Sequence, residues 1–348
     1  MSKIISFIIP SYNVERYLTT ALTSFITDNK DLNKQIEVIV VDDGSKDGTA
    51  DIARTFISRY PDMYRLIQKE NGGHGSTINV GSREAQGKYF KVIDADDWVV
   101  TENLPEYLRF LERSDADAVL TPFHMVDMAT KERIVQKMYS KDYSKLYTAE
   151  ELAGDWKSFD RCTTFHGITY RTEFYNRYRH ELPEKVFYED QEYATIPFCH
   201  AERIALLDLM VYQYLVGNSE QSVAKSNQIK RIGHLEAVIS HMLSYWEQHC
   251  SDLGFAKQYF LRKLESVVLS HYVVMCIKAD KKRDGHRRCR ALNRKLKNHC
   301  PLVYQMVRKK YMVYVLFSLL GISEESYEKL IHSSVFRLIR HNHEIEKE

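Results

Sequence analysis

The stretch ISFIIPSYNVERYL, residues 5–18, joins a continuous apolar run to a polar turn and the start of an amphipathic segment. The run at residues 5–10 is rich in β-branched residues and carries no charge, which is typical of a strand buried on both faces of a parallel sheet. After the turn, apolar residues recur at helical spacing, at Val14, Leu18, Ala21, Leu22 and Phe25. This stretch therefore predicts a β-strand followed by an α-helix.

The same order of strand and helix repeats along the first third of the chain. Apolar runs that predict further strands lie at residues 36–45, 64–70, 88–94 and 117–123. Segments that predict the helices between them lie at residues 47–60, 75–85 and 104–114. Because strands that alternate with helices pair in parallel, the sequence predicts an α/β fold with an open, mostly parallel, twisted sheet flanked by helices.

The later part of the chain has a different pattern. Residues 166–174, 203–208 and 211–217 predict three more strands, whereas the pattern from about residue 228 onward is helical. We therefore expect an α/β domain at residues 1–220 and a helical C-terminal region at residues 221–348.

The composition of the 348 residues, 44% hydrophobic and 28% charged, is ordinary for a soluble globular protein. The apolar run near the N-terminus is only as long as a strand and ends in Pro10, so it does not predict a signal peptide. The most apolar later window, residues 311–321, is too short to span a bilayer. The six cysteines form no CxxC pair, which indicates reduced thiols and a cytoplasmic location.

Positive charge is concentrated late in the chain. Residues 278–310 hold 13 lysines and arginines against 2 aspartates, although the formal charge of the whole chain is only +2. Followed by the apolar run, this segment predicts either peripheral docking on an anionic membrane surface or a solvated helix beside a packed one. Nucleic acid is not expected as a partner, because no stacking aromatics are interleaved at residues 278–300. The helical region could also contact the acceptor or form a homo-oligomer.

Polar segments that suit a nucleotide or a metal follow four of the predicted strands. They read PSYNVERY, DDGSKDG, ENGGHGS and DADDW, and ligands of open α/β sheets bind at the carboxyl ends of strands. Tyr12 offers a flat face for a base, with Asn13 and Glu15 as hydrogen-bonding groups, and Asp42 and Asp43 can accept from a base or a ribose. The amides of the glycine-rich segment can reach phosphate oxygens. Taken singly, each segment also fits a helix cap or a turn.

Two other nucleotide motifs are excluded. The chain has no GxxxxGK[ST] loop, and GGHGST lacks the third glycine of GxGxxG and follows the third strand instead of the first. A P-loop enzyme and a Rossmann dehydrogenase are therefore not expected.

The stretch KVIDADDWV, residues 91–99, concentrates negative charge after a buried strand. Asp94 and Asp96 are two residues apart, so both point to one side of an extended chain and could bind a hard divalent cation. Asp97 is expected to point away and to hold the turn. Asp115 and Asp117 have the same spacing but precede their strand, so we interpret them as solvated turn residues.

Together these segments resemble the family 2 glycosyltransferases, which have the GT-A fold. The matching segments are IIPSYNVERYL, IVVDDGSKDGT, NGGHGSTINVG, GKYFKVIDADDWV and FYEDQEY, and they cover roughly residues 4–192. The resemblance implies an inverting enzyme that transfers a sugar from a nucleotide-diphosphate donor, commonly a UDP-sugar, with Mg²⁺ or Mn²⁺ as the cofactor.

The resemblance also implies roles for individual residues. The base pocket would be lined by Pro10, Tyr12 and Glu15, and Asp43 would bind uracil. Asp94, with its neighbour Ala95, would lie near the ribose or the sugar, and Asp96 would be the metal ligand.

The loop after the third strand departs from the pattern NxGxxxARNxG, because no arginine precedes Asn79 here. Asn71, Gly72 and His74 are the donor contacts expected in this loop, with His74 in place of the arginine. Gln221 and Ser222 resemble a late loop that closes over the diphosphate.

Asp190, in the ED pair of FYEDQEY, would be the catalytic base that takes the proton of the acceptor hydroxyl. The alternative is that Asp190 caps the helix that follows it. Glu189 is predicted to make a structural or acceptor contact. His166 suits a packed core position as well as a functional one.

We expect the acceptor to be a saccharide or a polyprenyl-linked saccharide in the synthesis of a cell-surface polysaccharide or a lipid-linked oligosaccharide. One alternative is a sugar-phosphate nucleotidyltransferase, which should carry a glycine- and arginine-rich loop where this chain has PSYNVERY. The other is a non-catalytic module that binds nucleotide sugars. Intact Asp94, Asp96 and Asp190 argue against that module.

Overall fold

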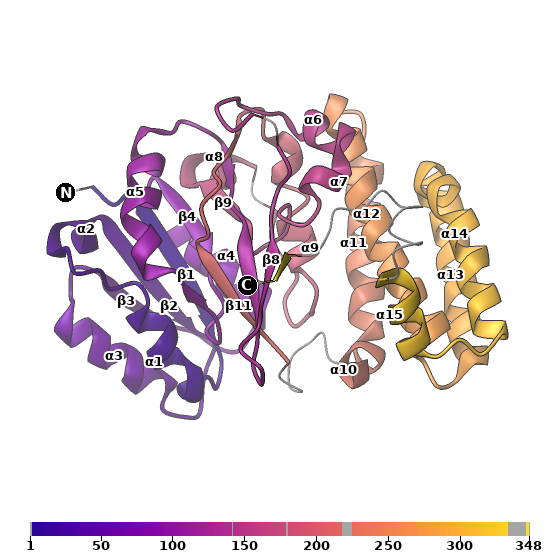
Figure 1. The fold of residues 1–348 in the computed structure, drawn as a ribbon, viewed down its shortest axis with the longest axis horizontal. Coiled ribbons are helices and arrows are strands. Elements are labelled where there is room, and N and C mark those ends of the chain that lie inside the picture. The colour runs from indigo at the N-terminus through magenta and orange to yellow at the C-terminus, as the bar shows by residue number, and fades with distance from the viewer. Residues whose placement is uncertain (1, 141, 179, 218–224, 333–345, 348) are drawn as a thin grey trace. The chain divides into compact units, whose positions relative to one another are not determined.

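The computed structural model describes residues 2–140, 142–178, 180–217, 225–332 and 346–347. The chain forms two compact units, one of Met1–Gly217 with Ile345–Glu348 and one of Asn218–Glu344. The β-sheets belong to the first unit, whereas the described part of the second is helical (Figure 1).

The larger sheet of the first unit has seven strands and carries the strand ends of interest. In spatial order they are β10 (Ile204–Leu206), β6 (Ala118–Leu120), β9 (Ile168–Arg171), β4 (Tyr89–Val92), β1 (Ile5–Ser11), β2 (Ile36–Asp42) and β3 (Tyr64–Gln68). Neighbours pair in parallel except β9, which is antiparallel to β4 and β6. All residues of β1 and β2 are buried, so both faces of the sheet are covered. The predicted open, mostly parallel sheet is confirmed.

Helices lie between the strands as the apolar spacing predicts. The described helices of this unit are α1 (Glu15–Thr23), α2 (Lys30–Gln35), α3 (Thr49–Arg59), α4 (His74–Glu84), α5 (Leu104–Arg113), α6 (Ala149–Gly154), α7 (Trp156–Phe159), α8 (Thr172–Arg177) and α9 (Asp190–Tyr193). In α1 the buried side chains include Leu18 and Leu22, which are on the expected face. The helix α4 packs against β1 and β2, and α3 packs against β2 and β3.

A smaller sheet was not predicted. Its strands, in spatial order, are β12 (Glu346–Lys347), β8 (Arg133–Gln136), β7 (Phe123–Asp127), β11 (Tyr212–Val216) and β5 (Trp98–Val99). The predicted strand at 117–123 is therefore divided, because the chain leaves the larger sheet after Leu120 and enters the smaller one at Phe123. Pro122, which lies between them, has no N–H to continue a ladder.

The predicted strand at 166–174 is wrong in its last three residues. β9 ends at Arg171, and α8 begins at Thr172. The N–H of Thr172 donates to the carbonyl oxygen of Lys88 at 3.0 Å as the chain turns out of the sheet. Because this contact joins segments that are distant in sequence, no local sequence pattern predicts it.

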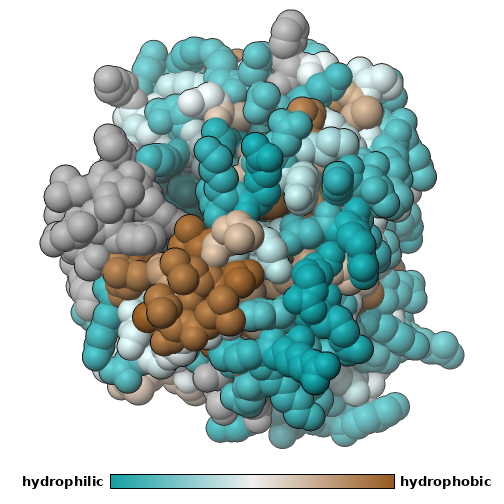
Figure 2. Space-filling view, turned by 90° about the vertical axis from the view of Figure 1, so that its right-hand side faces the viewer, coloured by the Kyte–Doolittle hydropathy of each residue, from teal (hydrophilic) through white to brown (hydrophobic). Residues whose placement is uncertain are grey.

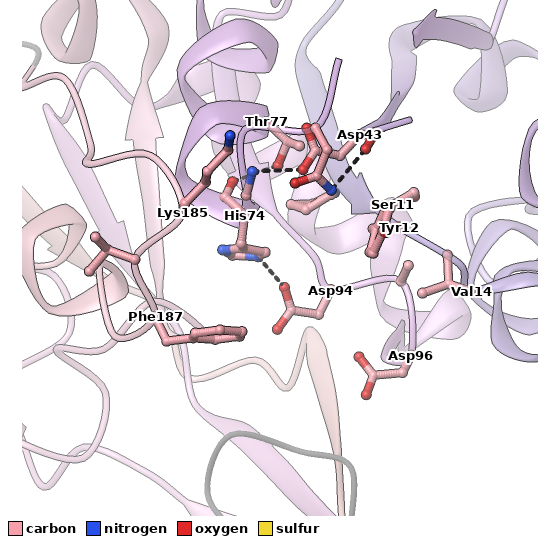
Figure 3. A pocket seen from close by; sticks show the side chains of 15 residues that line it. Ser11, Tyr12, Val14, Asp43, His74, Thr77, Asp94, Asp96, Lys185 and Phe187 are labelled. Carbon is pink, nitrogen blue, oxygen red and sulfur yellow. Dashed lines mark hydrogen bonds and ion pairs between the residues drawn. The ribbon is translucent and has the colours of Figure 1, made fainter. Parts of the chain in front are cut away.

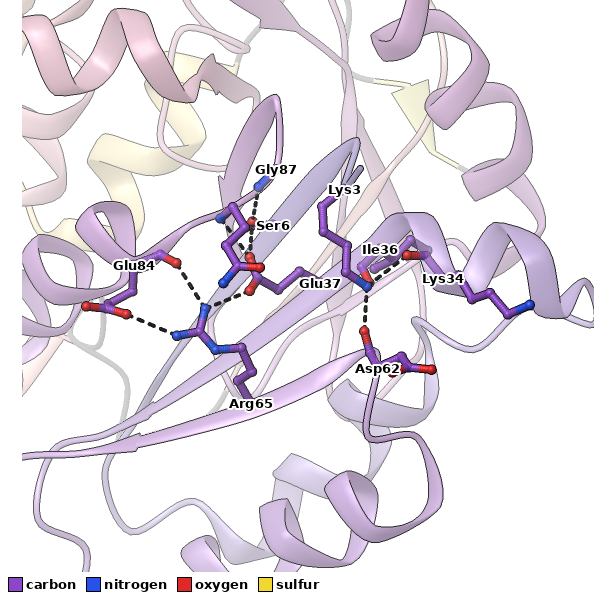
Figure 4. A network of polar contacts seen from close by, with 10 residues as sticks. Lys3, Ser6, Lys34, Ile36, Glu37, Asp62, Arg65, Glu84 and Gly87 are labelled. Carbon is purple, nitrogen blue, oxygen red and sulfur yellow. Dashed lines mark hydrogen bonds and ion pairs between the residues drawn. The ribbon is translucent and has the colours of Figure 1, made fainter. Parts of the chain in front are cut away.

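The amino-terminal edge of the sheet is fastened by polar contacts (Figure 4). The buried carboxylate of Glu37 accepts hydrogen bonds from the hydroxyl of Ser6 and from Arg65, which also bonds to Glu84 at the end of α4. The ammonium of Lys3 donates to the carbonyl oxygens of Ile36 and Lys34 at 2.8 Å. These contacts hold β1, β2 and β3 in register at the edge opposite the strand ends that concern function.

The second unit is built from α10 (Lys225–Lys230), α11 (Ile232–His249), α12 (Lys257–Tyr272), a π-helical turn (Val273–Lys278), α13 (Lys282–His299), α14 (Pro301–Leu319) and α15 (Glu324–His332). Glu236 of α11 accepts from His271 of α12 and from Arg288 of α13, so one carboxylate joins three helices. All six cysteines of the chain are free thiols. None of the helices in the described ranges has both the length and the apolar character needed to cross a bilayer.

Candidate active site

The carboxyl ends of β1, β2 and β4 and the first turn of α4 surround a cavity of about 450 Å³ in the first unit (Figure 3). Eight of the residues expected to bind the ligand line this cavity: Pro10, Tyr12, Asp43, Asn71, His74, Asp94, Ala95 and Asp96. The remaining lining residues were not predicted: Ser11, Val14, Gly73, Thr77, Lys185, Val186 and Phe187. The sheet topology thus brings together segments that are far apart in the sequence.

Three expected residues do not line the cavity. The carboxylate of Glu15 accepts from the N–H of Gly48 at 2.7 Å, so it fastens α1 to the loop before α3. Gly72 donates its N–H to Oδ1 of Asp43 at 2.9 Å and is not among the lining residues. Asp190 is the first residue of α9 and lies outside the lining. The predicted residues Gln221 and Ser222 fall outside the described residues.

Asp43 organises the glycine loop. Its buried carboxylate accepts from the ammonium of Lys69 at 2.7 Å and from the N–H groups of Gly72 and Gly73 at 2.9 and 2.8 Å. The amide of Asn71 donates to the carbonyl oxygen of Asp43 at 3.1 Å. Asp43 therefore orders the loop that forms one wall of the cavity, in addition to lining it.

The segment at residues 182–189 is clamped onto the start of α4. The side-chain amide of Asn79 bonds to both the carbonyl oxygen and the N–H of Leu182, and the N–H of Lys185 donates to the carbonyl oxygen of Gly72 at 2.7 Å. Gly73 has a φ of +87°, and a Cβ there would lie 2.8 Å from the nitrogen of Lys185. Glycine at position 73 therefore allows the segment to approach. This docking brings Lys185, Val186 and Phe187 to the cavity.

His74 bridges two carboxylates. One ring nitrogen lies 2.6 Å from Oε1 of Glu189 and the other lies 2.8 Å from Oδ1 of Asp94. Burial alone would lower the pKa of His74, but Asp94 and Glu189 offset it and hold the pKa well above its ordinary value. Burial would raise the pKa of Asp94, yet His74 holds it below its ordinary value. The geometry favours an imidazolium between two carboxylates.

Asp94, Asp96 and Asp97 each offer an oxygen within 4.8 Å of the others. In Figure 3 the carboxylate of Asp94 points toward His74, with which it bonds, and Asp96 lies beside it. Asp97 is buried and accepts from the hydroxyl of Tyr212 and from the N–H of Leu215. Its burial, and then the charges of Asp96 and Asp94, raise the pKa of Asp97 well above its ordinary value. Carboxylate oxygens are the ligands that Mg²⁺ and Mn²⁺ prefer, so this donor set fits a divalent cation.

The second pair of aspartates with this spacing, Asp115 and Asp117, lies outside the cavity. Asp115 is exposed and forms an ion pair with Lys88 at 3.4 Å. Asp117 accepts from the N–H groups of Glu202 and Arg203, so it fastens the start of β10 and is more than a solvated turn residue. Neither residue lines the cavity.

The ED pair lies at the start of α9. Glu189 occupies the cap position of this helix, and the side-chain amide of Gln191 donates to Oδ2 of Asp190 at 2.9 Å. Tyr214 lies in the combined field of the carboxylates: burial raises its pKa first, and Asp97, Asp94 and Asp190 raise it further. Asp190 therefore lies close enough to the aspartate cluster to act on the same tyrosine.

His166 is a packed residue. Its ring stacks on Tyr214 with centroids 4.3 Å apart and on Phe123 at 5.0 Å. Burial lowers the pKa of His166 to about 4, so the ring is neutral at physiological pH. It does not line the cavity. The structure thus favours the packing interpretation over a proton-transfer role.

A family model described as "Glycosyl transferase family 2" matches residues 6–179. Among curated proteins, "Glycosyltransferase GlyG" of Streptococcus pneumoniae is 31% identical over 167 residues, which is 45% of this chain and 52% of GlyG. "Uncharacterized glycosyltransferase EpsJ" of Bacillus subtilis is 24% identical over 265 residues, 75% of this chain and 72% of EpsJ. "Minor teichoic acid biosynthesis protein GgaB" of B. subtilis is 32% identical over 137 residues, 39% of this chain and only 15% of GgaB. The chain thus matches about half of GlyG and a small part of GgaB.

Among solved structures, S. aureus TarS 1–349 in complex with UDP-GlcNAc superposes with a TM-score of 0.51. The match covers 88% of this chain and 92% of that structure at 20% sequence identity. Similarity at this level concerns the fold, which is GT-A-like.

Proposed function

Because the chain belongs to glycosyl transferase family 2, we propose that this transferase moves a sugar from a nucleotide-diphosphate donor, a UDP-sugar, to an acceptor hydroxyl with inversion at the anomeric carbon. One observation carries the proposal. The cavity at the strand ends combines an exposed aromatic ring at Tyr12, the ordered loop at Asp43 and the aspartate cluster after β4. A base, a diphosphate and a divalent cation need these three kinds of group within one cavity.

The donor would lie along the strand ends. The base would stack on Tyr12, which is half exposed, beside Pro10. Asp43 would accept from the base, because Oδ2 has one hydrogen bond, from Gly73, and room for a second. Asn71 and His74 line the wall that the diphosphate would face.

The metal would be held by Asp96 together with Asp94. A bound Mg²⁺ or Mn²⁺ supplies positive charge that stabilises the diphosphate as a leaving group. Asp97 is held by β11 through Tyr212 and Leu215, so it would support the turn from behind. The bond from His74 fixes the rotamer of Asp94.

Asp190 would act as the base. The acceptor oxygen attacks the anomeric carbon on the face opposite the diphosphate, its proton passes to a carboxylate oxygen of Asp190, and the bond from carbon to the diphosphate oxygen breaks with its electron pair. Because the diphosphate is a good leaving group, one carboxylate suffices, whereas glycoside hydrolases need two. The bridge from His74 to Glu189 would hold the start of α9, and therefore Asp190, against the cavity.

The acceptor would be a saccharide or a polyprenyl-linked saccharide in the synthesis of a cell-surface polysaccharide. The relative named as a teichoic acid biosynthesis protein supports this class. With such an acceptor, the enzyme would work at the cytoplasmic face of the cell membrane.

The decisive experiment measures UDP release from a panel of UDP-sugars with Mn²⁺, with and without a mixture of saccharide acceptors. We expect one donor to be consumed, and faster with the acceptor. A sugar-phosphate nucleotidyltransferase would release pyrophosphate from a nucleoside triphosphate instead, and binding of a donor without turnover would indicate a non-catalytic module.

The metal assignment has its own test. Asp96→Asn should abolish the Mn²⁺-dependent part of UDP binding in calorimetry, because it removes a charged ligand. Asp115→Asn is the matched control, since this aspartate lies outside the cavity. Equal Mn²⁺ dependence in both variants would reject Asp96 as the ligand.

A further inference from the structure

A hollow of about 560 Å³ lies between α13 and α14 of the helical unit. Four cations line it, Arg290 and Arg294 from α13 and Arg308 and Lys309 from α14. Tyr304, Tyr311 and Asn293 complete the polar part of its lining, and Met312 also lines it. The hollow therefore offers positive charge from two helices to one place.

These four cations are not neutralised by carboxylates within the described part of the chain, where they form no ion pair. Their neighbours behave differently: Arg287 and Arg288 pair with Asp284, and Lys310 pairs with Glu265. Three guanidinium groups and one ammonium group held close together repel one another. A bound anion would relieve this repulsion, and guanidinium groups suit phosphate oxygens.

The hollow adjoins an exposed apolar face at the end of α14. Met312, Val313, Leu316, Leu319 and Leu320 have side chains between 46% and 73% exposed. Their spacing places them on one side of the helix, one turn beyond Arg308 and Lys309. Figure 2, which views this side of the helical unit, shows an apolar patch bordered by hydrophilic side chains. Exposed apolar patches beside cations indicate an interaction surface.

We propose that this surface docks on an anionic membrane, with lipid phosphates in the hollow and the apolar face of α14 among the upper acyl chains. Cations beside leucines on one helix face are the pattern of helices that lie in the membrane interface. A second copy meeting this face symmetrically would bring like charges together, which costs free energy. If nucleic acid bound to these cations instead, the five apolar side chains would remain exposed to water.

The test is flotation of the whole chain with vesicles of phosphatidylcholine, with and without phosphatidylglycerol, in the absence of donor and acceptor. We expect binding to the anionic vesicles only, and weaker binding as salt rises. The double variant Arg308→Gln, Lys309→Gln should lower the partition coefficient on the order of tenfold to thirtyfold, because each cation near an anionic surface contributes. The control Arg287→Gln, Lys295→Gln removes two positive charges of α13 that line a different hollow, with Glu236, and it should change the partitioning less.

A second variant tests insertion of the apolar face. Leu319→Trp replaces an exposed side chain, so it should fold, and its added fluorescence should shift to the blue with anionic vesicles only. Sedimentation at several protein concentrations tests whether a second copy of the chain covers this face instead.

Four outcomes would overturn the proposal: no flotation of the wild type, equal flotation with neutral vesicles, equal loss in both double variants, or a dimer that shields the added indole of the Leu319→Trp variant from the vesicles. Competition by inorganic phosphate distinguishes a site for free phosphate from one for lipid. Loss of flotation at low phosphate concentration is a fifth outcome that would overturn the proposal, because it would assign the hollow to free phosphate. Because no sugar transfer is measured, the result is independent of the proposed catalysis.

Discussion

The imidazole of His74 joins the aspartate turn after β4 to the start of α9, and this link gives Asp190 its place. Glu189 is held by His74 at 2.6 Å, and Asp190 is the next residue. The cap position of α9 is occupied by Glu189 and not by Asp190, so the proposed base would be positioned through its neighbour.

Asp190→Asn should lower kcat by a factor on the order of 10²–10⁴, because an amide cannot take the acceptor proton. The affinity for UDP should stay nearly unchanged, since Asp190 does not line the cavity. Steady-state kinetics and calorimetry measure the two quantities. Near-normal turnover would remove Asp190 from the mechanism, and Asp115→Asn serves as the control variant.

Lys91 in β4 gives a prediction about pH. Its buried ammonium donates to the carbonyl oxygens of His166 and Ile168, and burial lowers the pKa of Lys91 from 10.5 to about 7. Between these two values the unfolded chain binds more protons than the folded chain, so stability rises with pH. For one proton, the free energy of unfolding rises by about 1.4 kcal/mol per pH unit.

Chemical unfolding at pH 7.5 and 9 of wild type and Lys91→Met measures this effect. From the lower to the higher pH, the free energy of unfolding of the wild type should rise by on the order of 1–2 kcal/mol relative to that of the variant, because methionine does not titrate. Lys30→Met, which removes an exposed lysine on α2, should keep the wild-type slope. If the free energy of unfolding changed equally with pH in wild type and Lys91→Met, Lys91 would not titrate in this range.

At the residue scale, the parts of the cavity formed directly by strand ends could be predicted, because Tyr12, Asp43 and Asp94 each follow an apolar run. The contributions of Lys185 and Phe187 could not. These two residues reach the cavity through contacts between Asn79 and Leu182 and between Gly72 and Lys185, which have no local signature. Glu15 has the residue type that suits a base pocket, but the competing N–H of Gly48 takes its carboxylate.

At the element scale, the loop before α4 is the point where the cavity wall is assembled. Gly73→Ala would place a methyl group 2.8 Å from the nitrogen of Lys185 at a φ of +87°. We expect a loss of stability of about 1–3 kcal/mol and weaker binding of UDP, because the segment at 182–189 must move away.

Gly233→Ala in α11 is the matched control, because a Cβ there meets nothing within 4 Å. In a helix this change should be neutral or stabilise by about 0.4–1 kcal/mol. Thermal unfolding and calorimetry on the two variants make the comparison. Equal UDP affinity in Gly73→Ala and wild type would show that the segment does not depend on this contact.

The fold is predictable where each element is defined by its own residues. The buried strands β1 and β2 and the helices α1 and α3 follow from apolar periodicity. The smaller sheet is not predictable in this way, because its strands are short. Although β7 and β8 form a local antiparallel pair, β11 joins β7 and β5 across long separations. β9 is antiparallel for the same reason: its partners β4 and β6, and not its composition, determine its direction.

At the scale of the whole molecule, the two units have separate cores. Ile39 of β2 and Leu264 of α12 are both fully buried, each in its own unit. We propose that these units unfold as separate cooperative bodies.

Leu264→Ala should destabilise the helical unit by about 2–5 kcal/mol through the cavity that it creates. Hydrogen exchange should then rise in α11 to α14 while β1 to β4 keep their protection, and UDP binding should persist. Ile39→Ala should give the reverse pattern. A uniform rise over both units in either variant would show a single cooperative body.

The bond between His74 and Glu189 has an evolutionary consequence. Both partners act through their side chains, and a change at position 74 leaves the buried carboxylate of Glu189 without its matching charge. Among homologues, substitutions at positions 74 and 189 should therefore occur together. Asn79 should instead vary alone or not at all, because its partner is the backbone of Leu182, which every residue type supplies.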